Sequence, residues 1–204
     1  VVTDKNSYTK QTKNITINEP TAVQVTVTSQ QEVSCNGVCD GNAVAEASAG
    51  TPGYTYSWTN SLSSVVSAGT LANNLCAGTY DLLVSDNNSC TVTTSVTITE
   101  PAPLSVTLAV TTISCFNGTD GTVSSTVTGG TTPYLYEWNN IRTTANISGL
   151  SANTYSVTVT DKKGCVATAT ETLINPEELI VTLTSTLAGC GLSNVTSSVS
   201  ILQG

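Results

Sequence analysis

One segment of this chain occurs twice. Residues 35–58 read CNGVCDGNAVAEASAGTPGYTYSW, and residues 115–138 read CFNGTDGTVSSTVTGGTTPYLYEW. A second matching pair follows at a slightly smaller spacing, LCAGTYDLLVSDNNSC in 75–90 and LSANTYSVTVTDKKGC in 150–165. A unit repeated in this way is a building block that stacks into an array, so we expect this chain to be part of a scaffold.

Three prolines, each ending a similar short motif, place the repeat boundaries. The motifs ITINEP, TITEP and TLINP end at Pro20, Pro101 and Pro176. They predict the C-terminal part of a preceding repeat in 1–20, a first full repeat in 21–101, a second full repeat in 102–176 and the N-terminal part of a following, divergent repeat in 177–204. Each full repeat has the size of one small domain. We therefore expect this chain to be a window of a longer polymer.

The sequence within each repeat predicts short β-strands. VQVTVTS (23–29) and LSVTLAV (104–110) alternate apolar and polar residues, as half-buried strands do. Turn signals such as Asp40-Gly41 and Asp120-Gly121 separate the segments, and no segment has a helical period with caps. About seven short strands in each repeat predict an all-β fold of tandem immunoglobulin-like β-sandwiches.

Aromatic residues recur at matched positions and are expected to form the core. The predicted core aromatics are Tyr54, Tyr56, Trp58, Tyr80, Tyr134, Tyr136, Trp138 and Tyr155. Segments 75–80 and 150–155 resemble a tyrosine corner, in which the hydroxyl bonds back to nearby backbone. Phe116 lies outside this pattern, and two interpretations stay open for it. It either caps a cystine or forms an exposed contact point in a loop.

The cysteines also follow the repeat. Cys35, Cys115 and Cys190 occupy one equivalent position, and Cys90 and Cys165 occupy another. Pairing within each repeat predicts the bonds Cys35–Cys90 and Cys115–Cys165. Cys190 is then unpaired in this window, with its partner expected beyond Gly204.

Two additional cysteines carry a separate signal. Cys39 and Cys76 are present together in the first repeat and replaced together, by Thr119 and Ser151, in the second. This joint change predicts a bond between them. The alternative for all these cysteines is a set of reduced, buried thiols, but their matched positions favour disulfides and hence an extracellular compartment. A zinc site is not expected, because the chain has no His and no CxxC motif.

Composition bounds the function classes. Only 10% of the residues are charged, and the net charge is −8, so no basic stripe is available for nucleic acid. No long apolar run predicts membrane insertion of this segment. Without His no nucleophilic triad can be built, and the carboxylates recur at turn positions: Asp40, Asp120, Asp86 and Asp161. We therefore expect no enzyme and no cofactor. Calcium at a repeat junction stays open, since Asp and Asn oxygens suit it, although no DxDxDG loop occurs.

The ordered motifs SC-N-G…DGN, AGTPGYTYSW, LCAGTYDLLVSDNNSC and TITEP resemble the SprB-type repeat of the giant surface adhesins of gliding Bacteroidetes. The resemblance covers nearly the whole chain, with departures at Tyr8, which stands at a cysteine position, and after Cys190, where the DG turn is missing. It implies a cell-surface filament exported by type IX secretion and involved in gliding motility. The partners that it implies are neighbouring repeats, a surface polysaccharide or substratum, and the outer-membrane motility or secretion machinery.

Two function hypotheses follow. The first is a structural stalk segment of a large repetitive cell-surface adhesin filament that serves adhesion and gliding. The second is a carbohydrate-binding repeat module of a secreted surface protein, with ligand-contacting loops on each repeat.

Overall fold

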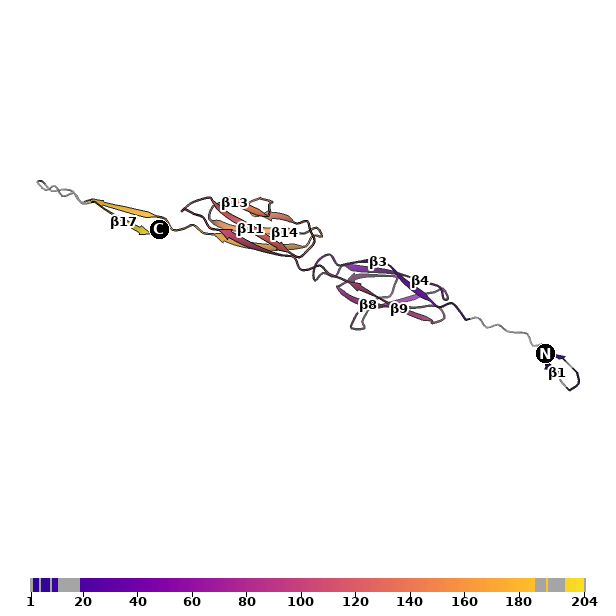
Figure 1. Cartoon of the computed structure of the whole chain (residues 1–204). Coiled ribbons are helices and arrows are strands. Elements are labelled where there is room, and N and C mark those ends of the chain that lie inside the picture. The colour runs from indigo at the N-terminus through magenta and orange to yellow at the C-terminus, as the bar shows by residue number, and fades with distance from the viewer. Residues whose placement is uncertain are drawn as a thin grey trace. The chain divides into compact units, whose positions relative to one another are not determined.

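The computed structural model describes residues 2–3, 5–7, 9–10, 19–185, 190 and 197–203, and Tyr8 lies outside this part. The chain divides into two compact units, one of Val1–Gln31 with Gly41–Ile98 and one of Glu32–Asp40 with Thr99–Gly204. The described residues form strands and no helix (Figure 1), so none of their elements is a candidate transmembrane helix. Short antiparallel pairs precede and follow the two sandwiches: β1 (Val2–Thr3) with β2 (Thr9–Lys10), and β16 (Ile180–Ser185) with β17 (Ser197–Gln203).

The first sandwich has seven antiparallel strands in two sheets. One sheet has the order β3-β4-β7, with β3 (Gln24–Gln31), β4 (Gly41–Ser48) and β7 (Leu71–Leu75). The other has the order β6-β5-β8-β9, with β6 (Val65–Ser67), β5 (Thr55–Thr59), β8 (Gly78–Ser85) and β9 (Thr91–Ile98). The chain thus passes from one sheet to the other after β4, after β6 and after β7, as in an immunoglobulin-like sandwich of two facing sheets.

The second sandwich repeats this arrangement with six strands. Its sheets have the orders β10-β11-β13 and β12-β14-β15. The strands are β10 (Ser105–Thr111), β11 (Gly121–Thr128), β12 (Leu135–Trp138), β13 (Asn146–Leu150), β14 (Asn153–Thr160) and β15 (Val166–Leu173). The described residues contain no counterpart of β6, because the segment between Trp138 and Leu150 is shorter than its counterpart in the first sandwich. The predicted all-β, immunoglobulin-like fold is confirmed.

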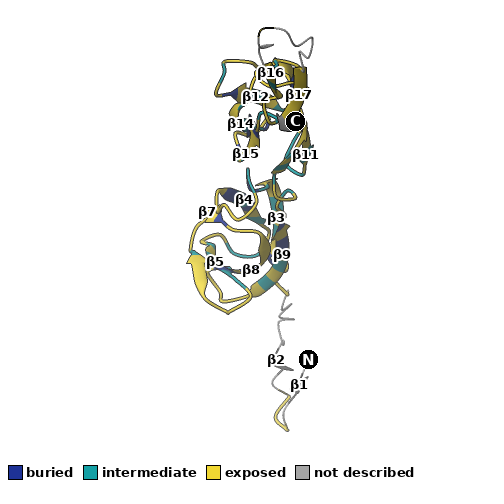
Figure 2. Cartoon of the chain, turned by 90° about the vertical axis from the view of Figure 1, so that its left-hand side faces the viewer, coloured by how far each residue is buried: buried dark blue, intermediate teal, exposed yellow. Residues whose placement is uncertain are grey.

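The core of each sandwich is centred on a tryptophan. Trp58 is fully buried and Trp138 is nearly so. In the first sandwich, alternate residues of β4 and β8 are buried together with Trp58 (Figure 2). Each indole N–H donates to a backbone carbonyl, to Gly69 at 2.9 Å and to Thr144 at 2.8 Å. A buried tryptophan needs such a partner, because an unpaired N–H loses its hydrogen bond to water.

The tyrosines divide into two groups. Tyr80 and Tyr155 are buried, and their hydroxyls donate to the carbonyls of Cys76 and Ser151, both at 3.0 Å. This is the tyrosine corner that the sequence predicts. The other predicted core tyrosines are half-buried: Tyr54, Tyr56, Tyr134 and Tyr136.

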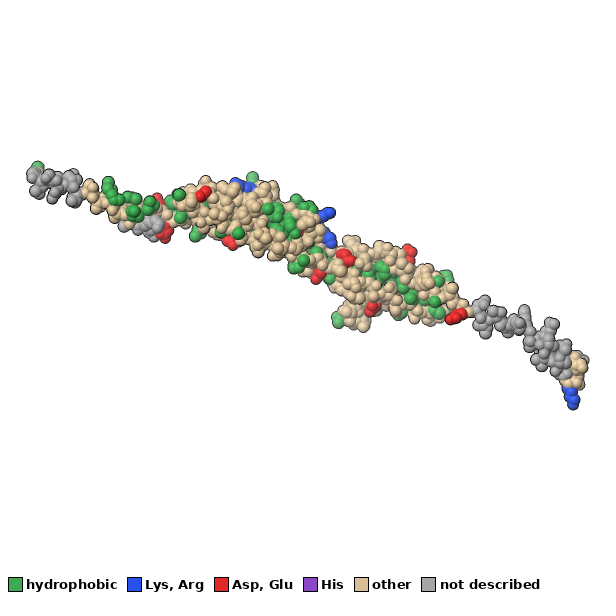
Figure 3. All heavy atoms as spheres, viewed as in Figure 1, with side chains coloured by type: hydrophobic (Ala, Val, Ile, Leu, Met, Phe, Trp, Pro, Cys, Tyr) green, Lys and Arg blue, Asp and Glu red, His purple; other side chains and the backbone are tan. Residues whose placement is uncertain are grey.

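The surface carries few charges. Figure 3 shows a few acidic and basic side chains scattered among hydrophobic and other uncharged groups on the face in view. On this face the basic side chains of the described residues do not form a stripe that would attract a polyanion.

Candidate functional site

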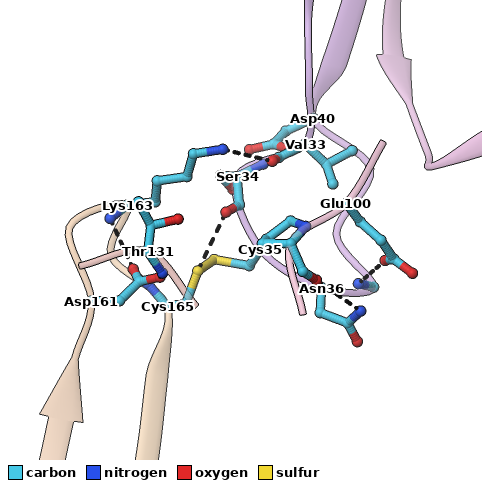
Figure 4. The surroundings of a disulfide bond; sticks show 12 residues. Val33, Ser34, Cys35, Asn36, Asp40, Glu100, Thr131, Asp161, Lys163 and Cys165 are labelled. Carbon is cyan, nitrogen blue, oxygen red and sulfur yellow. Dashed lines mark hydrogen bonds between the residues drawn. A yellow bond between two sulfur atoms is a disulfide. The ribbon is translucent and has the colours of Figure 1, made fainter. Parts of the chain in front are cut away.

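The candidate site is a disulfide that joins Cys35 to Cys165 (Figure 4). The two Cα atoms are 5.7 Å apart, within the usual range for a disulfide, and the sequence separation is 130 residues. Cys35 lies in the loop Glu32–Asp40, and Cys165 lies in the turn that connects β14 to β15. Both elements belong to the second compact unit, although the sequence places Cys35 in the first repeat.

Hydrogen bonds within the loop and to Glu100 shape the loop that carries Cys35. The Oδ1 atom of Asp40 accepts from the backbone N–H of Ser34 at 2.8 Å. Gly37 has φ +74°, a conformation that glycine adopts without strain, and its N–H donates to Oε2 of Glu100 at 2.8 Å. Hydrogen bonds from the side chain and the backbone of Ser34 lower the pKa of Asp40, so its carboxylate stays ionised and keeps the loop closed.

A buried aspartate builds the turn that carries Cys165. Asp161 is 3% exposed. Its Oδ1 atom accepts from the N–H groups of Lys163 at 2.8 Å and Cys165 at 2.9 Å, and its Oδ2 atom accepts from the N–H of Thr131 at 2.8 Å. Burial alone would raise the pKa of Asp161, but these backbone hydrogen bonds outweigh burial and lower it. Hydrogen bonds to Asp161 therefore hold the backbone of the turn from which the Cys165 side chain extends.

Two further contacts join the loop to the turn. Nζ of Lys163 donates to the carbonyl oxygen of Val33 at 3.2 Å, and Sγ of Cys165 lies 3.4 Å from the carbonyl oxygen of Ser34. Cys165 is buried and Cys35 is half-buried. The loop and the turn thus meet through one covalent bond and two contacts to backbone carbonyls, an arrangement that can transmit tension.

The predicted bonds Cys35–Cys90 and Cys115–Cys165 are wrong. Cys165 directly precedes β15, whereas the loop of Cys115 lies beyond the other end of that strand, where Nδ2 of Asn175 donates to Oδ1 of Asn117 at 3.3 Å. A strand of eight residues spans about 26 Å, far beyond the reach of a disulfide. The same separation applies in the first repeat, where Cys90 precedes β9 and the N–H of Val33 donates to the carbonyl of Thr99 just after it.

Of the remaining five cysteines, two are disulfide-bonded and three are free thiols. Cys39 and Cys76 are both disulfide-bonded, as the predicted pair requires. Cys90, Cys115 and Cys190 are exposed free thiols. Phe116, beside Cys115, is 42% exposed, so it does not cap a cystine.

The other carboxylates predicted to form turns do so. Asp86 is buried and accepts from the N–H groups of Thr51, Asn88 and Cys90, which lower its pKa. Hydrogen bonds from Ser114 lower the pKa of Asp120. In the part of the chain that the structure describes, no three His, Cys, Asp or Glu side chains are grouped as metal ligands would be.

A separate hollow of about 630 Å³ lies on the second sandwich. Its lining includes Tyr134, Tyr136, Glu137 and Ile141, and Ile141 is 93% exposed. Sequence analysis did not single out Ile141 or this hollow, because the segment after Trp138 has no recognisable pattern.

Comparison with known proteins finds one family. A family model described as the SprB repeat matches residues 27–63 and 107–143. No match was found among curated proteins. Solved structures that align with the chain include the N-terminal four Ig domains of Dscam1 isoform 9.44 (15% identity, 78% of this chain, 48% of that chain, TM-score 0.35). Another is the amphioxus IgVJ-C2 molecule (12% identity, 76% of this chain, 98% of that chain, TM-score 0.30). The chain spans about half the length of the Dscam chains.

Proposed function

We propose that this chain, in which residues 27–63 and 107–143 match a model of the SprB repeat, is a stalk segment of a large, repetitive cell-surface adhesin. In this role the segment holds an adhesive or anchoring part of the protein away from the cell. The match to the SprB repeat supports an adhesin-type surface protein, and disulfides fit an extracellular location.

The observation that carries the mechanical role is the bond between Cys35 and Cys165. Under tension applied to the two chain ends, force passes along the backbone to Cys35, crosses the S–S bond and continues from Cys165. The residues between these cysteines lie outside the path of the force. At 3.3–3.6 Å per residue, a loop of 130 residues corresponds to about 430–470 Å of extended chain that tension cannot draw out while the bond is intact.

Single-molecule pulling of the chain by its two ends tests this role. Under oxidising conditions we expect extension to stop short, because the segment between Cys35 and Cys165 is not released. Addition of a reductant should lengthen the fully extended molecule by about 450 Å, less the small end-to-end span of the folded segment. Without reductant the Cys35→Ser variant should lengthen by about 310–330 Å, because a Cys39–Cys76 bond still retains the residues between those two cysteines. Cys190→Ser serves as the matched control. Equal extension with and without reductant would contradict a load-bypassing bond.

We further propose, from the family, that the intact protein takes part in surface adhesion and gliding motility and reaches the surface by type IX secretion. Its expected partners are neighbouring repeats, a polysaccharide or other substratum, and the motility or secretion machinery of the outer membrane. Antibody labelling of intact, unpermeabilised cells tests the location. Attachment and gliding of cells that lack this segment test the role, and unchanged attachment of the deletion strain would argue against it.

A carbohydrate-binding module is the second candidate, favoured by the hollow beside Tyr136. Its aromatic lining is the kind of surface on which sugar rings stack. A glycan array with the full chain tests this candidate. Saturable binding that is lost in Tyr136→Ala, with the unfolding midpoint retained, would favour the module over the stalk.

A further inference from the structure

The two halves of the Cys35–Cys165 site occur a second time in this chain, and there they are not bonded. The counterpart of Cys35 is Cys115 in the second repeat, and the counterpart of Cys165 is Cys90 in the first repeat. Both counterparts are exposed free thiols.

The loop around Cys115 has the same construction as the bonded loop. Oδ1 of Asp120 accepts from the N–H of Ser114 at 3.2 Å, as Asp40 accepts from Ser34. The N–H of Gly118 donates to the carbonyl of Cys115 at 2.8 Å, and the equivalent bond from Val38 to Cys35 measures 3.2 Å. Asn117 takes φ +58° where Gly37 takes φ +74°. The loop therefore adopts its shape without the disulfide.

The turn around Cys90 also matches its bonded counterpart. Oδ1 of Asp86 accepts from the N–H groups of Asn88 at 2.9 Å and Cys90 at 2.8 Å, and Oδ2 accepts from the N–H of Thr51 at 2.9 Å. Asp161 makes the equivalent set of bonds beside Cys165. Each half-site is thus preorganised before a partner arrives, which lowers the entropy cost of joining.

The surroundings of the two loops differ in exposure. Ser34 and Cys35 are half-buried, whereas Ser114 and Cys115 are exposed. The turn that carries Cys165 accounts for the difference, because it covers the first loop. Beside Cys115 lies a hollow of about 460 Å³, lined by Ser114, Cys115, Phe116 and the segment 176–179.

We propose that repeats of this type are joined by a ladder of offset disulfides. In this ladder Cys115 bonds the Cys165-type cysteine of a repeat that follows, and Cys90 bonds the Cys35-type cysteine of a repeat that precedes. The occupant of the Cys115 loop is the Asp-x-x-x-Cys turn of another repeat, as at Cys35. This inference needs repeats in tandem but does not depend on the stalk role, because it concerns which thiols bond and not what the bonds serve.

The bond forms by two thiol–disulfide exchanges with a low-molecular-weight disulfide such as oxidised glutathione. The Cys115 thiolate attacks one sulfur of the oxidant, which gives a mixed disulfide and one released thiolate. The thiolate of the Cys165-type cysteine then attacks the Cys115 sulfur and releases the second thiolate. Two cysteines are oxidised, one disulfide is reduced to two thiols, and the two protons pass to the released thiolates.

A lengthened chain tests the ladder. Tandem duplication of 21–176 within the full chain places Thr21 after Pro176, just as it follows Pro20, and puts a Cys90 turn in the repeat after the first-copy Cys115. Cys90→Ser in the first copy and Cys115→Ser in the second make each remaining Cys90 and Cys115 peptide unique to one copy. After oxidation with glutathione, non-reducing peptide mapping of this variant should find the first-copy Cys115 bonded to the second-copy Cys90, with Cys190 as the remaining free thiol. The matched control, which carries Cys115→Ser in both copies and Cys90→Ser in the first, should free the second-copy Cys90 and leave both Cys35–Cys165 bonds in place. Free thiols at both predicted partners, or a bond from either to another cysteine, would overturn the ladder.

The original chain provides a second measurement, which holds even if the lengthened chain does not fold. A Cys90→Ser/Cys190→Ser variant retains the Cys115 thiol, and a Cys115→Ser/Cys190→Ser variant retains the Cys90 thiol. In an equimolar mixture oxidised with glutathione, random pairing of two equally accessible thiols gives the Cys115–Cys90 species as about half of the dimers. Unequal access of the two thiols lowers that share. The ladder predicts a clear excess of this species. A share of half or less contradicts it.

Discussion

Replacement of Cys35 by serine is the most direct perturbation of the fold. The substitution removes the bond to Cys165 and changes only one sulfur to oxygen in a half-buried loop. The hydrogen bonds of Ser34 and Asp40 that shape this loop do not involve the Cys35 side chain, so the loop should keep its form. The variant therefore tests the covalent constraint separately from local structure.

The magnitude follows from the length of the closed loop. In the chain-entropy model, a bond across 130 residues restricts the unfolded chain by an amount that stabilises the folded state by about 5 kcal/mol at 25 °C. Cys165→Ser should have the same effect. The double variant should be no less stable than either single variant, because each substitution already removes the whole bond.

Guanidinium unfolding of the oxidised proteins, followed by tryptophan fluorescence, measures these differences. Cys90→Ser is the matched control, since it makes the same chemical change at an exposed free thiol and should alter the free energy of unfolding by less than about 0.5 kcal/mol. If Cys35 were bonded to Cys90 instead, Cys90→Ser would destabilise the protein as much as Cys35→Ser. Such a result, or an unchanged stability of Cys35→Ser, would refute the assigned pairing.

Three further predictions concern the sandwiches themselves. Trp138→Ala should cost about 3–5 kcal/mol in chemical denaturation, because it empties the centre of the second core; a loss below about 1 kcal/mol would contradict its central place. Tyr155→Phe should cost about 1 kcal/mol by the same assay, since only the hydrogen bond to Ser151 is lost, and no loss would mean that the corner bond contributes nothing. Asp161 has a lowered pKa in the folded state, so its stabilisation is present above the unfolded pKa of about 3.9 and is lost as the pH falls through the folded value. Asp161→Asn should thus lower the melting temperature at pH 7, with a difference from the wild type that shrinks below about pH 4; a pH-independent difference would contradict this role of the charge.

Local features of these sandwiches could be predicted well from the residues. Strand segments such as 104–110 follow from period-2 alternation, which needs only the geometry of a half-buried strand. The tyrosine corners at Tyr80 and Tyr155 depend on partners four residues away, so short motifs specify them. The turns at Asp86 and Asp161 follow in part from the same kind of local bond, to Cys90 and Cys165, but each also needs a bond from a distant threonine. The hollow beside Tyr136 could not be predicted, because its lining comes from β12, β14 and an irregular segment.

The repeat by itself determined the strand pattern, the aromatic cores and the positions of the cysteines, since each of these is written into every copy. Which cysteine bonds which was decided only by the tertiary structure. A partner in the same repeat and a partner in the next repeat are equivalent positions in a periodic sequence, so periodicity cannot distinguish Cys35–Cys90 from Cys35–Cys165. The length of β9 and β15 makes the distinction, because each strand holds the two cysteines of its own repeat at opposite ends of the sandwich, beyond the reach of an S–S bond.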